Sequence, residues 1–220
     1  MLRVPRFFVV AGLGRFGRAV ARTLVEEGQS VLALDVDPER VQEMSHVLPR
    51  VARCDCTDME SLRVLGVQGC DVAVVAIGNS MEASILTTLA FKELGVRRVI
   101  AKAISDAHGK ALTRCGADRV VYPQRDMGVR VAHNLVSANV TEYVQLSPSH
   151  SMIELVAGPR LAGKSLRELA LSQRYEVNVM AIQRGRRTLV APRADEVVQL
   201  GDILVLLGPD RGIRELEENA

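Results

Sequence analysis

Three glycines and an aspartate have the types and the spacing of a site that holds the phosphates and ribose of a nucleotide. Gly12, Gly14 and Gly17 follow the apolar run 7–11, and Asp35 ends a second apolar run. We expect Gly12 to permit a tight turn, Gly14 to let backbone N–H groups approach a phosphate, and Gly17 to let a helix lie close to the strand. Asp35 can accept a hydrogen bond from a ribose hydroxyl. The spacing predicts a ligand with a free 2′-hydroxyl.

The elements that position these residues alternate between strand and helix. Apolar runs rich in Val, Ile and Ala recur with helical patterns between them, and strands that are apolar on both faces are typical of a covered parallel sheet. This predicts an α/β fold with a Rossmann-like, doubly wound parallel sheet. The runs lie at 7–11, 31–34, around 51, and at 72–77, 99–101 and 119–122.

Helix starts agree with this order. Asp37 before Pro38 predicts an N-cap followed by a proline in the first turn, and Thr57 with Glu60 has the spacing of a capping box. A further helix is expected from residues 79–80 to Gly95.

A second loop, residues 76–79, joins the fourth strand to that helix. We expect it at the carboxyl edge of the sheet beside the glycine turn, where open α/β sheets bind ligands. Lys102 and Arg125 follow the fifth and sixth strands and would add positive charge there. Arg15 stands in the first turn of a helix, where a cation opposes the helix dipole unless an anion compensates it. We expect Arg15 to face phosphate charge, on the same ligand or on one held by a neighbouring subunit.

The acidic residues at the ribose end narrow the choice of ligand. Asp35 and Asp37 would repel a 2′-phosphate, which argues against NADP. ATP, ADP and NAD(H) remain.

The regular alternation of predicted strands and helices ends near residue 140. A strand is expected at 141–146, and the Pro and Ser residues of 147–149 suggest a hinge or linker. We place the domain boundary between a nucleotide-binding domain, 1–140, and a linker with a small α+β domain, 141–220. The smaller domain is predicted from a strand at 152–157, a capping box at Ser165 and Glu168, a hairpin of 177–183 with 188–191, a strand at 203–207 and a helix from Pro209.

Composition excludes several classes of protein. Lys and Arg number 28 against 26 acidic residues, and three Tyr, four Phe and no Trp offer few platforms for stacking bases, so no nucleic acid partner is expected. The longest charge-free stretch in the apolar middle of the chain, 72–81, is too short to span a bilayer, which predicts a cytoplasmic protein. The cysteines show no metal-binding spacing and are expected to be free thiols. They are Cys54, Cys56, Cys70 and Cys115.

No catalytic constellation is recognisable. The four histidines pair with no acid at a catalytic spacing and are expected to be surface or packing residues. There is no G-x-S-x-G elbow, no P-loop lysine motif and no H-E-x-x-H. The sequence predicts a site that binds its ligand without converting it, so the protein is not expected to be an enzyme.

The ordered motifs of the chain resemble RCK (regulator of potassium conductance) domains of the TrkA family, and in particular the gating subunits of Ktr-type potassium-uptake systems. The small domain resembles the C-terminal ligand-binding domain of this family through residues 163–166 and 201–205. The motifs of the first domain are Val10 to Gly17, Asp55 to Asp58, Ala76 to Gly78, Gly116 to Arg119 and Asp126 to Gly128.

The resemblance implies a regulatory subunit that binds ATP and ADP in competition and gates a membrane potassium-translocating subunit allosterically. It also implies dimers that assemble into an octameric ring, located at the inner face of the cell membrane through that partner. Together with the pattern above, it assigns the nucleotide contacts to Gly12, Leu13, Gly14, Arg15, Phe16, Gly17, Asp35, Asp37, Asp55, Cys56, Ala76, Ile77, Gly78, Asn79, Lys102 and Gln124.

Two positions depart from the family's pattern. Gln124 stands where Ktr-type subunits have a glutamate suited to a divalent cation at the phosphates, and an amide oxygen is a weaker ligand for a hard cation. Relatives that bind cyclic di-AMP in the C-terminal domain carry an arginine upstream of Tyr-Gly, whereas this chain has Arg174, Tyr175 and Glu176 in sequence. The contacts that the resemblance implies for cyclic di-AMP are Asn178, Ile182 and Pro192.

Three other readings stay open. A Trk-type regulatory subunit that responds to NAD(H) would use the same glycines and Asp35. A small NAD-dependent oxidoreductase would need a catalytic residue that the sequence does not offer. A Rossmann-type redox-sensing repressor would need a basic helix-turn-helix segment.

Overall fold

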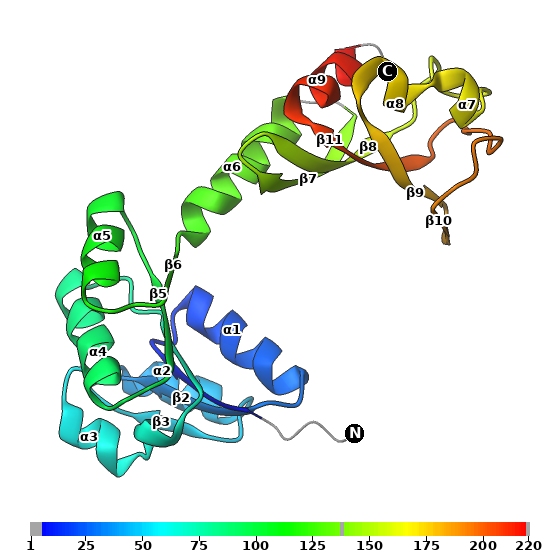
Figure 1. The fold of residues 1–220 in the computed structure, drawn as a ribbon. Coiled ribbons are helices and arrows are strands. Elements are labelled where there is room, and N and C mark those ends of the chain that lie inside the picture. Colours follow the sequence, from blue (N-terminus) through cyan, green and yellow to red (C-terminus); the bar gives the residue numbers. More distant parts are fainter. Residues whose placement is uncertain (1–5, 137–138, 219–220) are drawn as a thin grey trace. The chain divides into compact units, whose positions relative to one another are not determined.

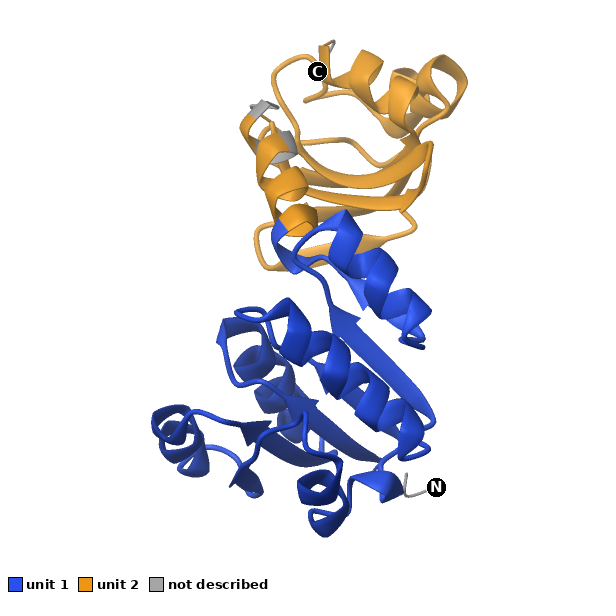
Figure 2. Cartoon of the chain, turned by 90° about the vertical axis from the view of Figure 1, so that its left-hand side faces the viewer, with its two compact units in different colours: residues 1–124 blue, residues 125–220 orange. Residues whose placement is uncertain are grey.

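A computed structural model describes residues 6–136 and 139–218 of the chain. The chain divides into two compact units, Met1–Gln124 and Arg125–Ala220, which are coloured separately in Figure 2. Each unit has its own sheet and its own hydrophobic core. The predicted fold class, a Rossmann-like parallel sheet followed by a small α+β domain, is confirmed.

The first unit contains a six-stranded sheet in the order β3-β2-β1-β4-β5-β6, and every neighbouring pair is parallel. The strand order reverses between β1 and β4, so the chain leaves these two neighbouring strands in opposite directions. This is the point at which open α/β sheets form a ligand crevice. The strands are β1 (Phe7–Ala11), β2 (Ser30–Asp35), β3 (Val51–Arg53), β4 (Val72–Val75), β5 (Arg98–Lys102) and β6 (Arg119–Val121).

Helices cover both faces of this sheet (Figure 1). Successive residues of β1 point to opposite faces: Val9 packs in a core cluster with Phe91, and Val10 packs in another with Met44. The first cluster lies under α3, α4 and α5, and the second under α1 and α2. The helices are α1 (Arg15–Glu26), α2 (Pro38–Ser45), α3 (Met59–Val64), α4 (Met81–Glu93) and α5 (Asp106–Arg114), with a 3-10 turn at Val67–Gly69.

The caps of α2 and α3 test two predictions. Asp37 caps α2, accepting the Glu39 N–H at 2.9 Å, with Pro38 at the first helical position, as predicted. For α3 the predicted Thr57 cap is wrong. Asp58 caps that helix, because the Thr57 hydroxyl is engaged by Asp55 at 2.7 Å.

The second unit contains an antiparallel sheet in the order β10-β9-β11-β8-β7. The capping box of Ser165 and Glu168 and the hairpin with Gly185 in its turn are confirmed. Its elements are α6 (Pro123–Val136, which begins in the first unit), β7 (Val140–Ser147), β8 (His150–Val156), α7 (Leu166–Leu169), α8 (Leu171–Tyr175), β9 (Asn178–Arg184), β10 (Arg187–Val190), β11 (Ile203–Pro209) and α9 (Asp210–Glu218).

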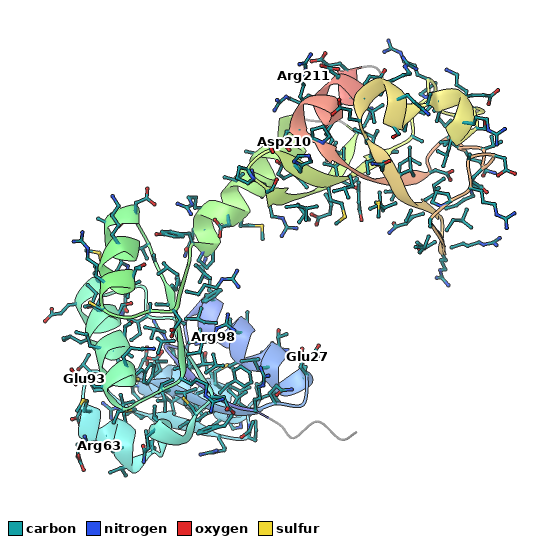
Figure 3. The ribbon with its side chains drawn as sticks, viewed as in Figure 1. Glu27, Arg63, Glu93, Arg98, Asp210 and Arg211 are labelled. Carbon is teal, nitrogen blue, oxygen red and sulfur yellow. The ribbon has the colours of Figure 1, made fainter. Side chains whose placement is uncertain are left out.

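The start of α9 is fastened to the sheet of this unit by a polar network. The buried Ser151 hydroxyl on β8 donates to Asp210 Oδ1 at 2.6 Å and lies 2.7 Å from the Tyr143 hydroxyl on β7. Asp210 is labelled in Figure 3.

The linker expected at residues 147–149 is instead the turn of a hairpin. Ser147 on β7 pairs with His150 on β8, and Pro148 and Ser149 form the turn between them. A proline is tolerated there because a turn residue need not donate to the ladder. The predicted domain border between residues 140 and 141 stays a prediction. The compact units of the structure divide between Gln124 and Arg125.

None of the described helices is both long and apolar enough to cross a membrane.

Candidate nucleotide-binding site

The predicted site residues of the first unit follow the carboxyl ends of its strands. Gly12 follows β1, Ala76 follows β4, and Asp35 and Lys102 are the last residues of β2 and β5. Because parallel strands end at one edge of their sheet, the fold brings these segments to the same edge. The Ala76 N–H donates to Ala11 O at 2.7 Å, which ties the two loops of the switch point together.

The three glycines of the turn differ in what a side chain at each position would meet. Gly12 has φ +97°, and a Cβ there would lie 2.9 Å from Ile77 N. A Cβ on Gly17 would overlap the Gly12 carbonyl oxygen. A Cβ on Gly14, in contrast, would meet no atom within 4 Å. Gly12 and Gly17 are therefore needed by the fold, whereas the space at Gly14 is open to a ligand.

The N-terminus of α1 presents backbone donors at this edge. Gly14 is its N-cap and supplies no side-chain hydrogen bond, and the first turn holds no acidic residue. The first N–H groups of a helix have no partner inside the helix, so an anion is the natural complement at this end. Arg15 and Phe16 belong to this turn, Arg15 exposed and Phe16 half-buried.

Asp35 has two backbone partners. Its Oδ2 accepts the Leu13 N–H at 2.5 Å and its Oδ1 accepts the Asp37 N–H at 2.9 Å. The carboxylate is almost fully buried, and Arg40 Nη1 lies 3.6 Å from Oδ2. A carboxylate accepts about four hydrogen bonds, so Asp35 can shape the glycine loop and still receive a ribose hydroxyl.

Asp37 and Arg40 complete this end of the site. Arg40 Nε lies 3.2 Å from Asp37 Oδ2, so one arginine faces both aspartates. Arg40 was not predicted from the sequence. Its position in the first turn of α2, three residues after an N-cap aspartate, is the signal that could have found it.

Lys102 is a buried cation beside the second loop. A Cβ on Gly78 would lie 2.9 Å from Lys102 Nζ, and the side chain is only 9% exposed. Within residues 6–136 and 139–218, no carboxylate forms an ion pair with it. A buried ammonium is costly unless an anion compensates it, so Lys102 fits a phosphate. Asn79, in the same loop, is exposed.

The segment after β3 carries a pair of thiols. The Cys56 thiol is hydrogen-bonded to Cys54, and this bond, with burial, raises the pKa of Cys56 well above its ordinary value. The same bond lowers the pKa of Cys54. Asp55 between them is exposed and accepts the Thr57 N–H at 3.0 Å. Within the described residues, no group of three or more His, Cys, Asp or Glu side chains could hold a metal ion.

Gln124 follows another strand of the same sheet, and the second set of predicted contacts lies in the second unit. Gln124 is exposed in the first turn of α6, which follows β6, two strands from β4 in the sheet order. In the second unit Asn178 is exposed and Pro192 half-buried, but the Ile182 side chain is fully buried in the core. The whole residue is buried, and its strand pairs on both sides, so Ile182 offers no accessible surface to a ligand.

His108 is buried in the first unit. Its Nδ1 lies 3.4 Å from the Ile104 N–H, and its Nε2 has no partner in the described part of the chain. Burial lowers the pKa of His108, so the ring is neutral near pH 7. This agrees with the packing role expected for the histidines.

Comparison with known proteins assigns a domain family to each unit. The TrkA-N domain family matches residues 8–123 and the TrkA-C domain family matches residues 151–220. The Ktr system potassium uptake protein C of Bacillus subtilis (strain 168) is 44% identical over 211 residues, which cover 96% of each chain.

Two solved structures are also similar. The GsuK RCK domain matches all of this chain with a TM-score of 0.69 and 20% identity, a likeness of fold, and this chain spans 48% of its length. GsuK bound to ADP matches 60% of this chain with 26% identity and a TM-score of 0.51, and the match covers 34% of that structure.

Proposed function

The chain belongs to the family of proteins built from a TrkA-N and a TrkA-C domain, and from this premise we propose that it is a nucleotide-binding regulatory subunit of a potassium-uptake system. In this role it binds ATP and ADP at the carboxyl edge of the first unit's sheet. It passes the identity of the nucleotide to a membrane potassium-translocating subunit, at the cytoplasmic face of the membrane.

One observation carries the nucleotide part of the proposal. The N-terminus of α1, whose first turn holds no acidic residue, and the buried Lys102 ammonium, which forms no ion pair within the described residues, are two positive features at one sheet edge. A di- or triphosphate supplies that charge. Asp35 supports the ribose, and the open space at Gly14 admits the phosphates.

Gating requires that ATP and ADP contact two shapes of the assembly differently, because a ligand shifts an equilibrium only by its differential affinity. We assign this difference to the γ-phosphate facing Arg15 of an adjacent subunit. The exposed guanidinium of Arg15 in the first turn of α1 is free to reach beyond its own chain.

Self-association is supported by exposed apolar side chains in the second unit. On α6 they are Met127, Val129, Val131 and Leu135, and on β7 they are Val144 and Leu146. Exposed apolar residues gathered on one element are typical of an interface. We propose that dimers of this chain assemble into an octameric ring.

NAD(H) is the second candidate ligand, because the glycines and Asp35 serve either nucleotide. Catalysis is not part of the proposal, since the site residues offer backbone donors, cations and a hydroxyl acceptor but no group placed for proton transfer to a substrate. A divalent cation beside Gln124 and cyclic di-AMP at Asn178 and Pro192 are further ligands to be tested.

The test is a calorimetric titration of the purified chain with ATP, ADP, NADH and cyclic di-AMP, with particle mass recorded alongside. Binding of ATP and ADP to a particle of about eight subunits is the expected result. A preference for NADH would replace the adenine nucleotides in the proposal. Absence of any nucleotide binding would contradict it.

A further inference from the structure

Side chains of two helices form a bridge to the Leu13 carbonyl group of the glycine loop. Arg18 Nε on α1 donates to Leu13 O at 2.6 Å, and Arg18 Nη1 lies 2.5 Å from Glu43 Oε2 on α2. A guanidinium is planar and rigid, so these two contacts are set together. The glycine loop is in this way tied to α2.

The Leu13 residue is held from both directions. Its N–H donates to Asp35 Oδ2 at 2.5 Å, and its carbonyl accepts from Arg18. The peptide that joins Leu13 to Gly14 is trans, and in a trans peptide the carbonyl and the following N–H point in opposite directions. Fixing the Leu13 carbonyl therefore fixes the direction of the Gly14 N–H. That N–H has no hydrogen-bond partner in the described part of the chain.

We propose that Arg18, held by Glu43, is a positioning residue that orients the Gly14 N–H and the first turn of α1 toward the phosphates of the nucleotide. This inference rests on the proposed function, because it concerns the phosphate end of the same site. Arg18 and Glu43 contact the phosphate loop and neither aspartate of the ribose end, whereas Arg40 pairs with both of those aspartates. Loss of Arg18 should therefore weaken ligands in proportion to their phosphates.

The test compares Arg18→Gln with Arg22→Gln. Arg22 lies on the same helix one turn later and is exposed, so its substitution removes the same charge without touching the loop. For Arg18→Gln we expect ATP to bind about fivefold more weakly, the size of an ordinary net hydrogen-bond loss and not that of a charged donor, because Arg18 acts on the phosphates only through the loop. Competition by adenosine, which has no phosphate, should be unchanged. Arg22→Gln should bind both ligands as the unchanged protein does.

Glu43 provides a second, independent variant. Glu43 is 59% exposed, so Glu43→Gln should weaken ATP binding only about twofold. In the double variant with Arg18→Gln the Glu43 substitution should have no further effect, because Glu43 acts through Arg18. Fully additive effects would overturn the proposed bridge.

Hydrogen exchange at the Leu13 amide separates this inference from the proposed function. Without nucleotide, the Leu13 amide should exchange faster in Arg18→Gln than in Arg22→Gln, by more than any difference in their global unfolding accounts for. If the unchanged protein binds no nucleotide, the proposed function fails, and faster exchange still supports the bridge. Equal exchange in the two variants, equal ATP affinity, or an equal loss for ATP and adenosine would each overturn the positioning role.

Discussion

The Asp35 carboxylate accepts the Leu13 N–H at 2.5 Å, so the acidic residue at the end of β2 holds the glycine loop that follows β1. The two strands are neighbours in the sheet. A residue predicted from the sequence as a ribose acceptor is thus also part of the loop's own structure. Changes at Asp35 should affect both stability and nucleotide binding.

Asp35→Ala should lower the free energy of unfolding by about 2 kcal/mol, because it removes a charged acceptor from a buried N–H. Asp35→Asn keeps an oxygen for the Leu13 N–H and should be less damaging. Asp37→Asn is the matched control, since asparagine caps a helix about as well and only the contact with Arg40 is lost. Urea unfolding measures all three. A loss in Asp37→Asn as large as that in Asp35→Ala would contradict this account.

The glycines should separate folding from binding. Gly17→Ala places a methyl group on the Gly12 carbonyl oxygen and should lower stability by about 3 kcal/mol or prevent folding. Gly14→Ala meets no protein atom, so the fold should lose at most about 1 kcal/mol at this N-cap. The same methyl group lies where a phosphate would approach, and ATP affinity should fall. Scanning calorimetry and ATP titration test the pair; unchanged ATP affinity in Gly14→Ala would place the phosphates elsewhere.

Lys102→Met should weaken nucleotide binding without harming the fold. The ammonium is buried without a carboxylate partner among the described residues, so its removal should leave the thermal unfolding midpoint unchanged or raise it. ATP should bind about tenfold more weakly, as expected for loss of a charge-assisted hydrogen bond. Lys110→Met, at an exposed position of α5, is the control for loss of a positive charge. Equal ATP affinities in the two variants would show that Lys102 does not contact the phosphates.

Acid should weaken the second unit through Asp202. This buried carboxylate accepts from Arg184 Nε at 2.9 Å and Nη2 at 2.8 Å, and from the Gln199 N–H at 2.8 Å. These bonds, chiefly those from Arg184, hold the pKa of Asp202 below its ordinary value. The carboxylate therefore stabilises the folded state above its unfolded pKa of about 3.9, and this stability is lost as the pH falls below that value toward the folded pKa.

Asp202→Asn should lower the unfolding free energy by about 2 kcal/mol at pH 7 and flatten the loss of stability below pH 5. Asp195→Asn, at an exposed position, should keep the acid dependence of the unchanged chain. Calorimetric unfolding between pH 7 and pH 3 provides the comparison. An acid dependence that persists in Asp202→Asn would assign it to other carboxylates.

The sequence predicted the glycine turn between β1 and α1 well because its requirements are local. Gly17 lies against the Gly12 carbonyl group only five residues away, and the spacing from these glycines to Asp35 is that of one strand-helix-strand unit. Contacts between side chains of separate helices have no such spacing. Arg18 and Glu43 belong to different helices, and only the packed structure brings them together.

The errors arose where two local patterns compete. Thr57 and Asp58 are both good N-caps, and the choice depends on Asp55, which engages the Thr57 hydroxyl. Pro148 with its serine neighbours reads equally as linker or as turn, and the pairing of β7 with β8 decides for the turn. In each case the deciding partner lies outside the motif itself.

The two hydrogen bonds that hold Leu13, one at its N–H and one at its carbonyl group, have a thermodynamic consequence. A loop whose peptide groups are already fixed loses little conformational entropy when a ligand arrives, so nucleotide binding need not be coupled to local folding. Its heat-capacity change should then be small, as in a rigid receptor. The free energy released at the phosphates is left available to favour one arrangement of subunits over another.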